Sequence, residues 1–449
     1  MTNNHADNIL VRFLRNVVGP AAIMAAGMIG AGAVSTRLLA GTWFGFDLLW
    51  VAIFVIPMVI FTVDSASRVG IFSGHRGMLD MVKTDIHPGL AWFFFIPIFL
   101  LNLVISMSQM SVMIEAAYGA LGIELPAGGA VTPGIIVTML TLTAVTIVLV
   151  IRGGYKGLEK IMTGLLLFIL ACFIIVAIKG LMDWHTWKGL AFGLIPKIPA
   201  DVQVLGADRI RSGFTQLMGI AGQALPSAVF LAYGYFTSNA DYSEADLKMN
   251  FRKSVLNFGI IWGLFSIVVV VAGTTALHDV YRSTAVVAGE ISHFSQIENV
   301  IDAGKVITPA MPDAISFLAP RIFSLGLLGA AFTTLVTVAM TMSYFTLDMF
   351  GMDWRYHSGN KPFRWSLVFW FAVPSFVCVF WNLPSLLKAI LAMVGNLVPT
   401  PISLGIIIYF INKKSLMGNF TAGIGRNIVL GITCAFSLYV LVYGTIRMF

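Results

Sequence analysis

Charged residues are scarce in this sequence, and their scarcity decides the class of the protein. Asp, Glu, Lys and Arg make up 11% of the 449 residues, while apolar residues make up 58%. A soluble domain carries about 25% charged residues and could not cover its surface with so few. The apolar residues also come in runs of roughly 20, which is the length that a helix needs to cross about 30 Å of hydrocarbon. The composition therefore predicts an all-α polytopic membrane protein embedded in a lipid bilayer.

Cysteine is equally rare, and the usual signatures of catalysis are missing. Cys172, Cys378 and Cys434 lie far apart inside apolar runs, a pattern that indicates neither a disulfide framework nor a cysteine metal site. The seven histidines are scattered, and we find no glycine-rich phosphate loop followed by Lys and Ser or Thr. We therefore expect no enzyme activity, no catalytic residue and no cofactor.

The net charge of +7 indicates membrane topology and not nucleic-acid binding. Lys and Arg gather in short loops between the apolar runs, as the positive-inside rule describes. This predicts an integral plasma-membrane protein with a cytoplasmic N-terminus and, for an odd number of spans, an extracellular or periplasmic C-terminus. The polar segment before the first run lacks the apolar core and cleavage site of a signal peptide, so we expect the first run to remain in the mature protein.

We expect eleven membrane spans. Their limits in the sequence are about 18–41, 45–67, 88–121, 133–151, 158–181, 208–237, 254–277, 314–347, 364–382, 385–411 and 425–447.

Two of these spans carry helix-breaking residues in the middle. Gly30 and Gly32 interrupt the first span, and Gly222 and Pro226 interrupt the sixth. Glycine weakens a helix by about 1 kcal/mol relative to alanine, and proline removes a backbone donor. Breaks five spans apart indicate an inverted-repeat transporter with its substrate site near the bilayer centre. The alternative is ordinary glycine packing between helices with a proline kink.

Four segments in order resemble the Nramp family of divalent-metal transporters. They read GPAAIMAAG with TRLLAGTWFGFDLLWV in the first two spans, SRVGIFSG at 67–74, RGGYKGLEKIM at 152–162 and NKKSLMGNF at 412–420. The resemblance implies a LeuT-like fold in a single transmembrane domain. In that fold, two inverted five-helix repeats would span about 18–181 and 208–411, with spans 1 and 6 broken. One extra helix would follow at about 425–447.

The sequence departs from the family at the residues that bind metal. The family's Asp-Pro-Gly-Asn motif falls on Gly30-Ala31-Gly32-Ala33, and its Met-Pro-His motif falls on Leu225-Pro226-Ser227. The Asp and Glu that the family associates with proton movement fall on Ser106 and Gln109. Transition metals prefer anionic oxygen, imidazole or sulfur ligands, and Gly30, Ala33 and Leu225 supply no such side chain. We therefore predict no metal-ligating residue.

A helix N-terminus instead offers free backbone donors and a partial positive charge. We therefore hypothesise a secondary-active transporter that works by alternating access on a small carboxylate-bearing organic solute, such as an amino acid or a derivative. The alternative is a divalent metal cation of the Mg²⁺ or Mn²⁺ kind, and a non-transporting sensor is a third class without support in the sequence. The predicted substrate-binding residues are Gly30, Ala31, Gly32, Ala33, Ser35, Thr36, Arg37, Ser106, Gln109, Gln223, Leu225, Ser227 and Asn396.

Arg37 and a threonine stripe leave further alternatives open. Arg37 lies about one helical turn past the first break, and a charge inside a span indicates function by default. Three interpretations of Arg37 are open: it steers the substrate, it faces an outer vestibule, or it pairs with Glu115. Thr333, Thr334, Thr337 and Thr341 form a polar stripe on the eighth span, which either holds sodium or bonds to its own backbone. A coupling ion, Na⁺ or H⁺, is left open, and the oligomeric state is not predicted.

Overall fold

The computed structural model describes residues 17–126, 131–203, 210–278, 300–306, 308, 311–381, 383 and 385–448. The N-terminal segment 1–16, predicted to be cytoplasmic, and position 208, the predicted start of the second repeat, lie outside these residues.

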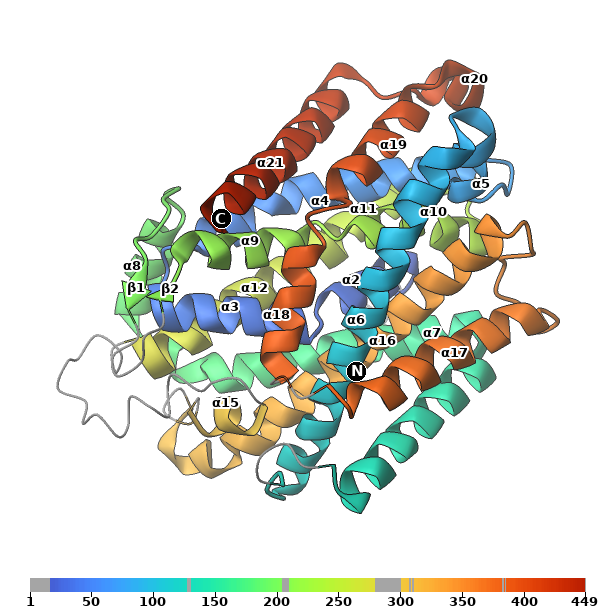
Figure 1. Cartoon of the computed structure of the whole chain (residues 1–449). Helices are drawn as coiled ribbons and strands as arrows, with labels where there is room; N and C mark the ends of the chain where they lie inside the picture. The colour runs from blue at the N-terminus through green and yellow to red at the C-terminus, as the bar shows by residue number, and fades with distance from the viewer. Residues whose placement is uncertain are drawn as a thin grey trace, which may run out of the picture.

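The protein is built almost entirely of helices (Figure 1). The α-helices of the first half are α2 (Pro20–Met28), α3 (Ala31–Phe44), α4 (Leu49–Phe72), α5 (Met78–Asp85), α6 (Pro88–Leu121), α7 (Pro133–Met182) and α8 (Trp184–Gly193). Those of the second half are α9 (Gly213–Ala224), α10 (Ser227–Asn239), α11 (Leu247–Ser254), α12 (Trp262–Gly273), α15 (Val300–Val306), α16 (Ala319–Met349), α17 (Lys361–Cys378), α18 (Ser385–Gly395), α19 (Thr400–Asn412), α20 (Lys414–Met417) and α21 (Ile424–Met448). Between the halves, β1 (Val202–Gln203) and β2 (Ile210–Arg211) form a short antiparallel pair.

The helices confirm a multi-pass membrane protein. Among the described residues, seven helices are long and apolar enough to cross a bilayer, or up to nine if each bent pair of helices forms one span. The predicted fourth and fifth spans are the two helical segments of α7, which meet at a kink at Gly154, where φ is 58° and ψ is −178°. The predicted ninth span is the 18-residue helix α17. The division into two repeats stays a prediction.

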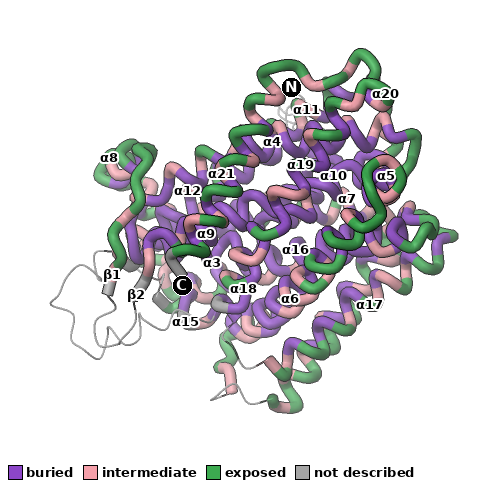
Figure 2. The backbone as a smooth tube through the Cα atoms, turned by 45° about the horizontal axis from the view of Figure 1, so that its top comes forward, coloured by how far each residue is buried: buried purple, intermediate pink, exposed green. Residues whose placement is uncertain are grey.

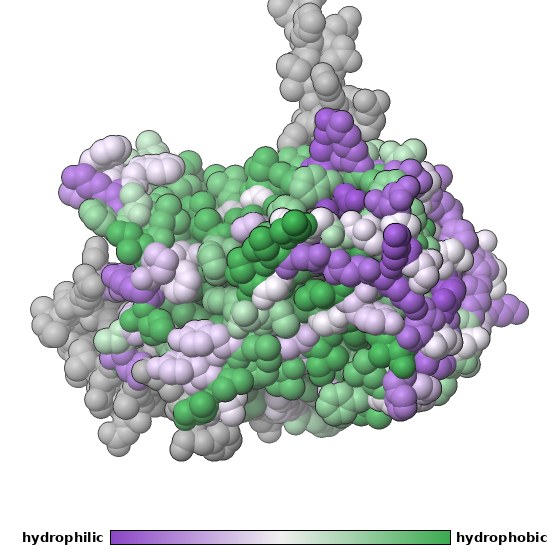
Figure 3. All heavy atoms as spheres, turned by 90° about the horizontal axis from the view of Figure 1, so that it is seen from above, coloured by the Kyte–Doolittle hydropathy of each residue, from purple (hydrophilic) through white to green (hydrophobic). Residues whose placement is uncertain are grey.

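Burial is distributed as a bilayer requires. Figure 2 shows the buried residues concentrated in the central helices, which include α3, α9, α10 and α16. Apolar side chains also face outward: Phe93 and Leu100 of α6 are 64% and 57% exposed. Figure 3 shows a largely hydrophobic surface whose hydrophilic residues gather mainly toward the right, the side on which α5 and α20 lie in Figure 1. Lipid replaces water around such an apolar belt.

Both predicted breaks are present, and they lie at the centre of the fold. Helices α2 and α3 meet at 49°, with Gly30 in an extended conformation between them. A Cβ atom on Gly30 would lie 2.0 Å from Thr334 Oγ1, and one on Gly32 would lie 2.5 Å from Met393 Cγ. These glycines therefore allow the broken helix to approach α16 and α18 closely. Helix α9 ends at Ala224 and α10 begins at Ser227, so the second break contains Pro226.

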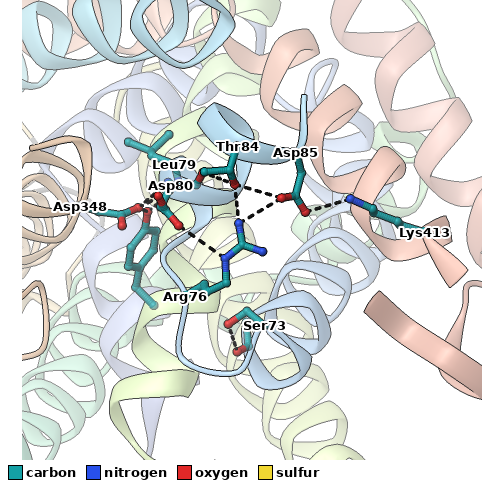
Figure 4. Close-up of polar contacts among 10 residues, drawn as sticks. Ser73, Arg76, Leu79, Asp80, Thr84, Asp85, Asp348 and Lys413 are labelled. Carbon is teal, nitrogen blue, oxygen red and sulfur yellow. Dashed lines mark hydrogen bonds and ion pairs between the residues drawn. The ribbon is translucent and has the colours of Figure 1, made fainter. Parts of the chain in front are cut away.

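A polar cluster secures α5 at the end of α16 (Figure 4). Asp348 accepts hydrogen bonds from the backbone N–H groups of Leu79 and Asp80, at 2.9 and 3.0 Å. The hydroxyl of Tyr235 donates to the same carboxylate oxygen. Asp348 therefore supplies acceptors to the first turn of α5, whose leading N–H groups have no partner within the helix.

Candidate functional site

A small cavity lies where the two breaks meet α6, α16 and α18. Its volume is about 40 Å³, which is room for about three water molecules at ~10–15 Å³ each. The lining residues come from both broken helices and from the three helices around them. They are Gly27, Met28, Gly30, Gly32, Ala33, Asn102, Ile105, Gln109, Gln223, Pro226, Ala228, Val229, Thr334, Thr337, Val338, Thr341, Met393 and Asn396.

Two glutamines hold the first break in place. Gln109 of α6 accepts a hydrogen bond from the backbone N–H of Ala31 at 3.1 Å. Gln223 of α9 donates to the carbonyl of Met28 at 2.5 Å, and its side-chain oxygen accepts from Arg37. Backbone groups released by the break are thus paired with side chains from distant parts of the sequence, as burial in a membrane requires.

The threonine stripe on α16 is a packing contact with α2. Thr334 donates to the carbonyl of Gly27 at 2.5 Å, and Thr333 donates to that of Ala26 at 2.8 Å. Thr337 reaches the carbonyl of Ile23 at 3.3 Å and that of Thr333 at 2.9 Å. These hydroxyls therefore donate to backbone carbonyls of α2 and in part of their own helix, and a sodium site at the stripe stays a prediction.

Three oxygens on the cavity are left free to accept a ligand. Asn102 Nδ2 donates to the carbonyl of Ile98 at 2.8 Å, and Asn396 Nδ2 donates to Met393 Sδ at 3.8 Å. Within the described part of the chain, neither asparagine oxygen receives a hydrogen bond, and the buried hydroxyl of Thr341 has no partner. Buried polar groups are normally hydrogen-bonded, so these oxygens mark the ligand-facing side of the cavity.

Arg37 lies beside the cavity and is completely buried. Its Nε donates to the hydroxyl of Ser266 at 2.9 Å, its Nη1 donates to the carbonyl of Ala33 at 3.3 Å and to Gln223, and its guanidinium carbon lies 4.9 Å from the ring centre of Trp262. It therefore neither faces an open vestibule nor pairs with Glu115. That carboxylate accepts from the hydroxyl of Ser385 and from a backbone N–H at 3.1 Å.

The predicted site residues divide into two groups. Those that line the cavity are Gly30, Gly32, Ala33, Gln109, Gln223 and Asn396. Those that are buried nearby without lining it are Ala31, Ser35, Thr36, Arg37, Ser106, Leu225 and Ser227. Ser35 and Thr36 donate to the carbonyls of Ala31 and Gly32, one turn earlier in their own helix, at 2.7 and 2.8 Å. Helical serines and threonines commonly form such bonds.

The predicted substrate-binding residues did not include several lining residues, among them Asn102 and Met393. A signal existed for Asn102, because Asn102, Ser106 and Gln109 recur at the i, i+4, i+7 spacing of one helix face. Thr341, which also lines the cavity, belongs to the threonine stripe predicted on the eighth span. Met393 carried no such signal, since methionine usually fills space in the apolar core.

A family model described as natural resistance-associated macrophage protein-like (Nramp) matches residues 21–447. The chain belongs to the Nramp family. The predicted resemblance is thereby confirmed, and so is the expectation of a transporter and not an enzyme.

Solved structures agree with the fold of this Nramp protein. The crystal structure of a single-residue mutant of the Eremococcus coleocola manganese transporter matches with a TM-score of 0.73 and 16% sequence identity, covering 96% of this chain and 86% of that one. The same transporter in complex with an aromatic bis-isothiourea substituted compound matches with a TM-score of 0.71 and 16% identity, covering 97% and 87%. The LeuT-like fold is therefore confirmed.

The prediction of a carboxylate-bearing organic solute is wrong. Membership of the Nramp family, together with structural similarity to a manganese transporter, points to divalent metal transport, which was the alternative. The geometry agrees, because the N–H of Ala31 at the supposed carboxylate cradle is already bound to Gln109. The remaining free groups identified on the cavity, Asn102 and Asn396 among them, are oxygen acceptors and suit a cation.

Proposed function

We propose that this Nramp protein carries a divalent cation of the hard, oxygen-preferring class, Mg²⁺ or Mn²⁺, across the membrane. The observation that carries the proposal is the set of free oxygens of Asn102, Asn396 and Thr341 on the cavity between the broken helices. Hard cations prefer oxygen ligands, including amide carbonyls and water. Family membership and the manganese transporter of the same fold support this substrate class.

The ligands of this site are neutral. Among the described residues, no group of three or more His, Cys, Asp and Glu could hold a metal ion. The side-chain ligands offered are amide, hydroxyl and thioether groups, so the cation has to keep part of its water shell. Mg²⁺ dehydrates reluctantly and usually keeps several waters, and the cavity has room for about three of them by the ~10–15 Å³ measure. We expect weaker cation binding than at a carboxylate site.

The driving force follows from the same neutrality. The described residues that line the cavity include no Asp, Glu, His, Lys or Arg, so no side chain there can take up and release a proton between pH 5 and 8. A membrane potential does act on the cargo, by about 2.3 kcal/mol per charge per 100 mV, or about 4.6 kcal/mol for a dication. We therefore propose transport driven by the potential, with the half-helices α2–α3 and α9–α10 opening the site alternately to each side.

Uptake into proteoliposomes tests the substrate. The purified protein is reconstituted with a Mg²⁺- or Mn²⁺-sensitive dye inside, and a K⁺ diffusion potential, negative inside, is imposed with valinomycin. We expect dication entry that grows with the potential and persists without a pH gradient. Entry of neither ion would refute the proposal, and entry that requires a proton gradient would refute its driving force.

Paired asparagine variants test the site. Asn396→Leu removes one free cavity oxygen while keeping the side-chain size. We expect uptake to fall about tenfold or more, since a polar contact with a charged group is worth about 1.5–3 kcal/mol and about 1.4 kcal/mol corresponds to a factor of ten. Asn412→Leu at the end of α19 is the matched control, because Asn412 lies outside the cavity and bonds Asn427. Equal uptake by the two variants would remove the cavity from the mechanism.

A further inference from the structure

Arg37 is a fully buried cation, and no carboxylate of the described residues pairs with it. Each of its contacts in the described chain is neutral: the hydroxyl of Ser266, the carbonyl of Ala33, the amide oxygen of Gln223 and the ring of Trp262. An uncompensated charge at this depth is costly, and intramembrane charges normally pair with one another. Arg37 therefore differs from the usual arginine in a membrane span.

Arg426 of α21 shows the usual arrangement in the same protein. Its guanidinium lies 2.6 Å from Asp64 of α4, and Arg68 lies 2.8 Å from the same carboxylate oxygen. Two cations there share an anion inside the bundle. Among the described residues, the lack of a counter-charge is therefore a feature of the surroundings of Arg37 and not of buried arginines in this protein in general.

The surroundings of Arg37 also contain more donors than acceptors. Its Nη2 and the indole Nε1 of Trp262 are both buried, and neither has a hydrogen-bond partner among the described residues. The hydroxyl of Ser266 accepts from Arg37 Nε and donates to the carbonyl of Trp262 at 2.9 Å. Two unpaired donors on residues in contact, one of them positively charged, call for a small negatively charged acceptor.

We propose that a monovalent inorganic anion, chloride, binds between α3 and α12, held by Arg37 Nη2 and Trp262 Nε1 and flanked by Ser266. The anion neutralises Arg37, whose Nη1 is bonded to the cavity residue Gln223. A dication entering the cavity then meets a neutral pair and not a fixed positive charge. The effect on cation transport rests on the proposed function, whereas anion binding itself does not.

Anion binding is tested on the purified full-length protein without any dication. Its stability to thermal unfolding is measured while chloride replaces gluconate at constant ionic strength, with bromide as a second halide. A ligand at ten times its dissociation constant raises the ratio of folded to unfolded protein roughly elevenfold. We expect saturable stabilisation of that order by both halides.

Three variants locate the anion. Arg37→Gln should lose the halide stabilisation, and Trp262→Phe, which keeps the ring but removes the N–H group, should weaken halide binding several-fold. Arg426→Gln is the control and should keep the full halide response, since Arg426 already has Asp64 as its partner. Equal stability of the wild type in chloride and gluconate, or an unchanged halide response in both Arg37→Gln and Trp262→Phe, would overturn the proposal.

Uptake experiments separate this inference from the proposed function. Dication entry is compared in chloride and in gluconate, and binding linkage predicts that chloride raises the apparent cation affinity as much as the cation raises that of chloride. Halide stabilisation through Arg37 without any dication entry would leave the anion site intact and refute the cation substrate. Dication entry at equal affinity in both salts would refute the coupling to the anion.

Discussion

Replacement of Asp348 by alanine should destabilise the end of the bundle at which α5 is secured. Asp348 is 4% exposed and accepts from the N–H groups of Leu79 and Asp80 and from the hydroxyl of Tyr235. It fits closely over Gly77, where a Cβ atom would lie 2.0 Å from Asp348 Oδ1. The carboxylate therefore packs directly against Gly77.

The magnitude follows from the groups that lose their acceptor. Loss of a helix cap costs about 0.5–2 kcal/mol, and a buried hydroxyl left unpaired costs about 1–3 kcal/mol more. We therefore expect Asp348→Ala to lower the free energy of unfolding by about 1.5–5 kcal/mol. Asp348→Asn keeps one acceptor oxygen and should cost less than half as much.

The assay is unfolding in detergent micelles combined with hydrogen exchange of the amides of α5. The control is Asp80→Ala, which removes a 39% exposed partner of Arg76 at 3.4 Å, an interaction worth about 0–1 kcal/mol. Amides of α5 should exchange faster in Asp348→Ala and stay near wild type in the control. If Asp348→Ala unfolds like the control with unchanged exchange in α5, the carboxylate does not hold this helix.

Three further predictions concern other parts of the fold. Hydrogen bonding from Lys413 lowers the pKa of Asp85 from 3.8 to about 2. The stability that this carboxylate adds is therefore complete above pH 3.8 and is lost as the pH falls toward 2. Acid titration of thermal stability should show this loss in the wild type but not in Asp85→Asn. Gly70→Ala places a Cβ atom 2.3 Å from a backbone oxygen of α10 and should cost about 1–3 kcal/mol in denaturant unfolding, whereas Gly431→Ala, with open space around it, should be neutral or stabilising. Thr400→Val removes a 2.7 Å bond to the carbonyl at the α9–α10 break; we expect a loss of about 1 kcal/mol, and unchanged unfolding would show that this bond does not stabilise the break.

Several features were predictable because their causes are local in the sequence. The apolar runs specify membrane helices, and glycine or proline in mid-span specifies where a helix is weak, so the breaks at Gly30 and Pro226 were located without a structure. The Nramp resemblance also came from short contiguous segments. The boundary between the fourth and fifth spans was also predictable, since the kink in α7 at Gly154 lies within the loop expected between them.

The substrate could not be read from the sequence, because it depends on which polar groups remain free after folding. An isolated half-helix beginning at Ala31 offers a donor to an anion. In the folded chain Gln109, 78 residues away, occupies that donor, and the free groups on the cavity are the oxygens of Asn102 and Asn396 instead.

Local sequence thus determined the class of the protein, its spans and the position of its breaks, since hydropathy and backbone propensity act over a few residues. Tertiary structure decided which side chains hydrogen-bond to the backbone groups released by the helix breaks, and which polar side chains remain free to bind a ligand. Hydrogen-bond pairing inside a membrane links residues from distant helices, and the sign of the charge that the cavity accepts is set only when those pairs have formed. Arg37 shows this most clearly: a charge one turn past the break was visible in the sequence, but its neutral surroundings appear only in the fold.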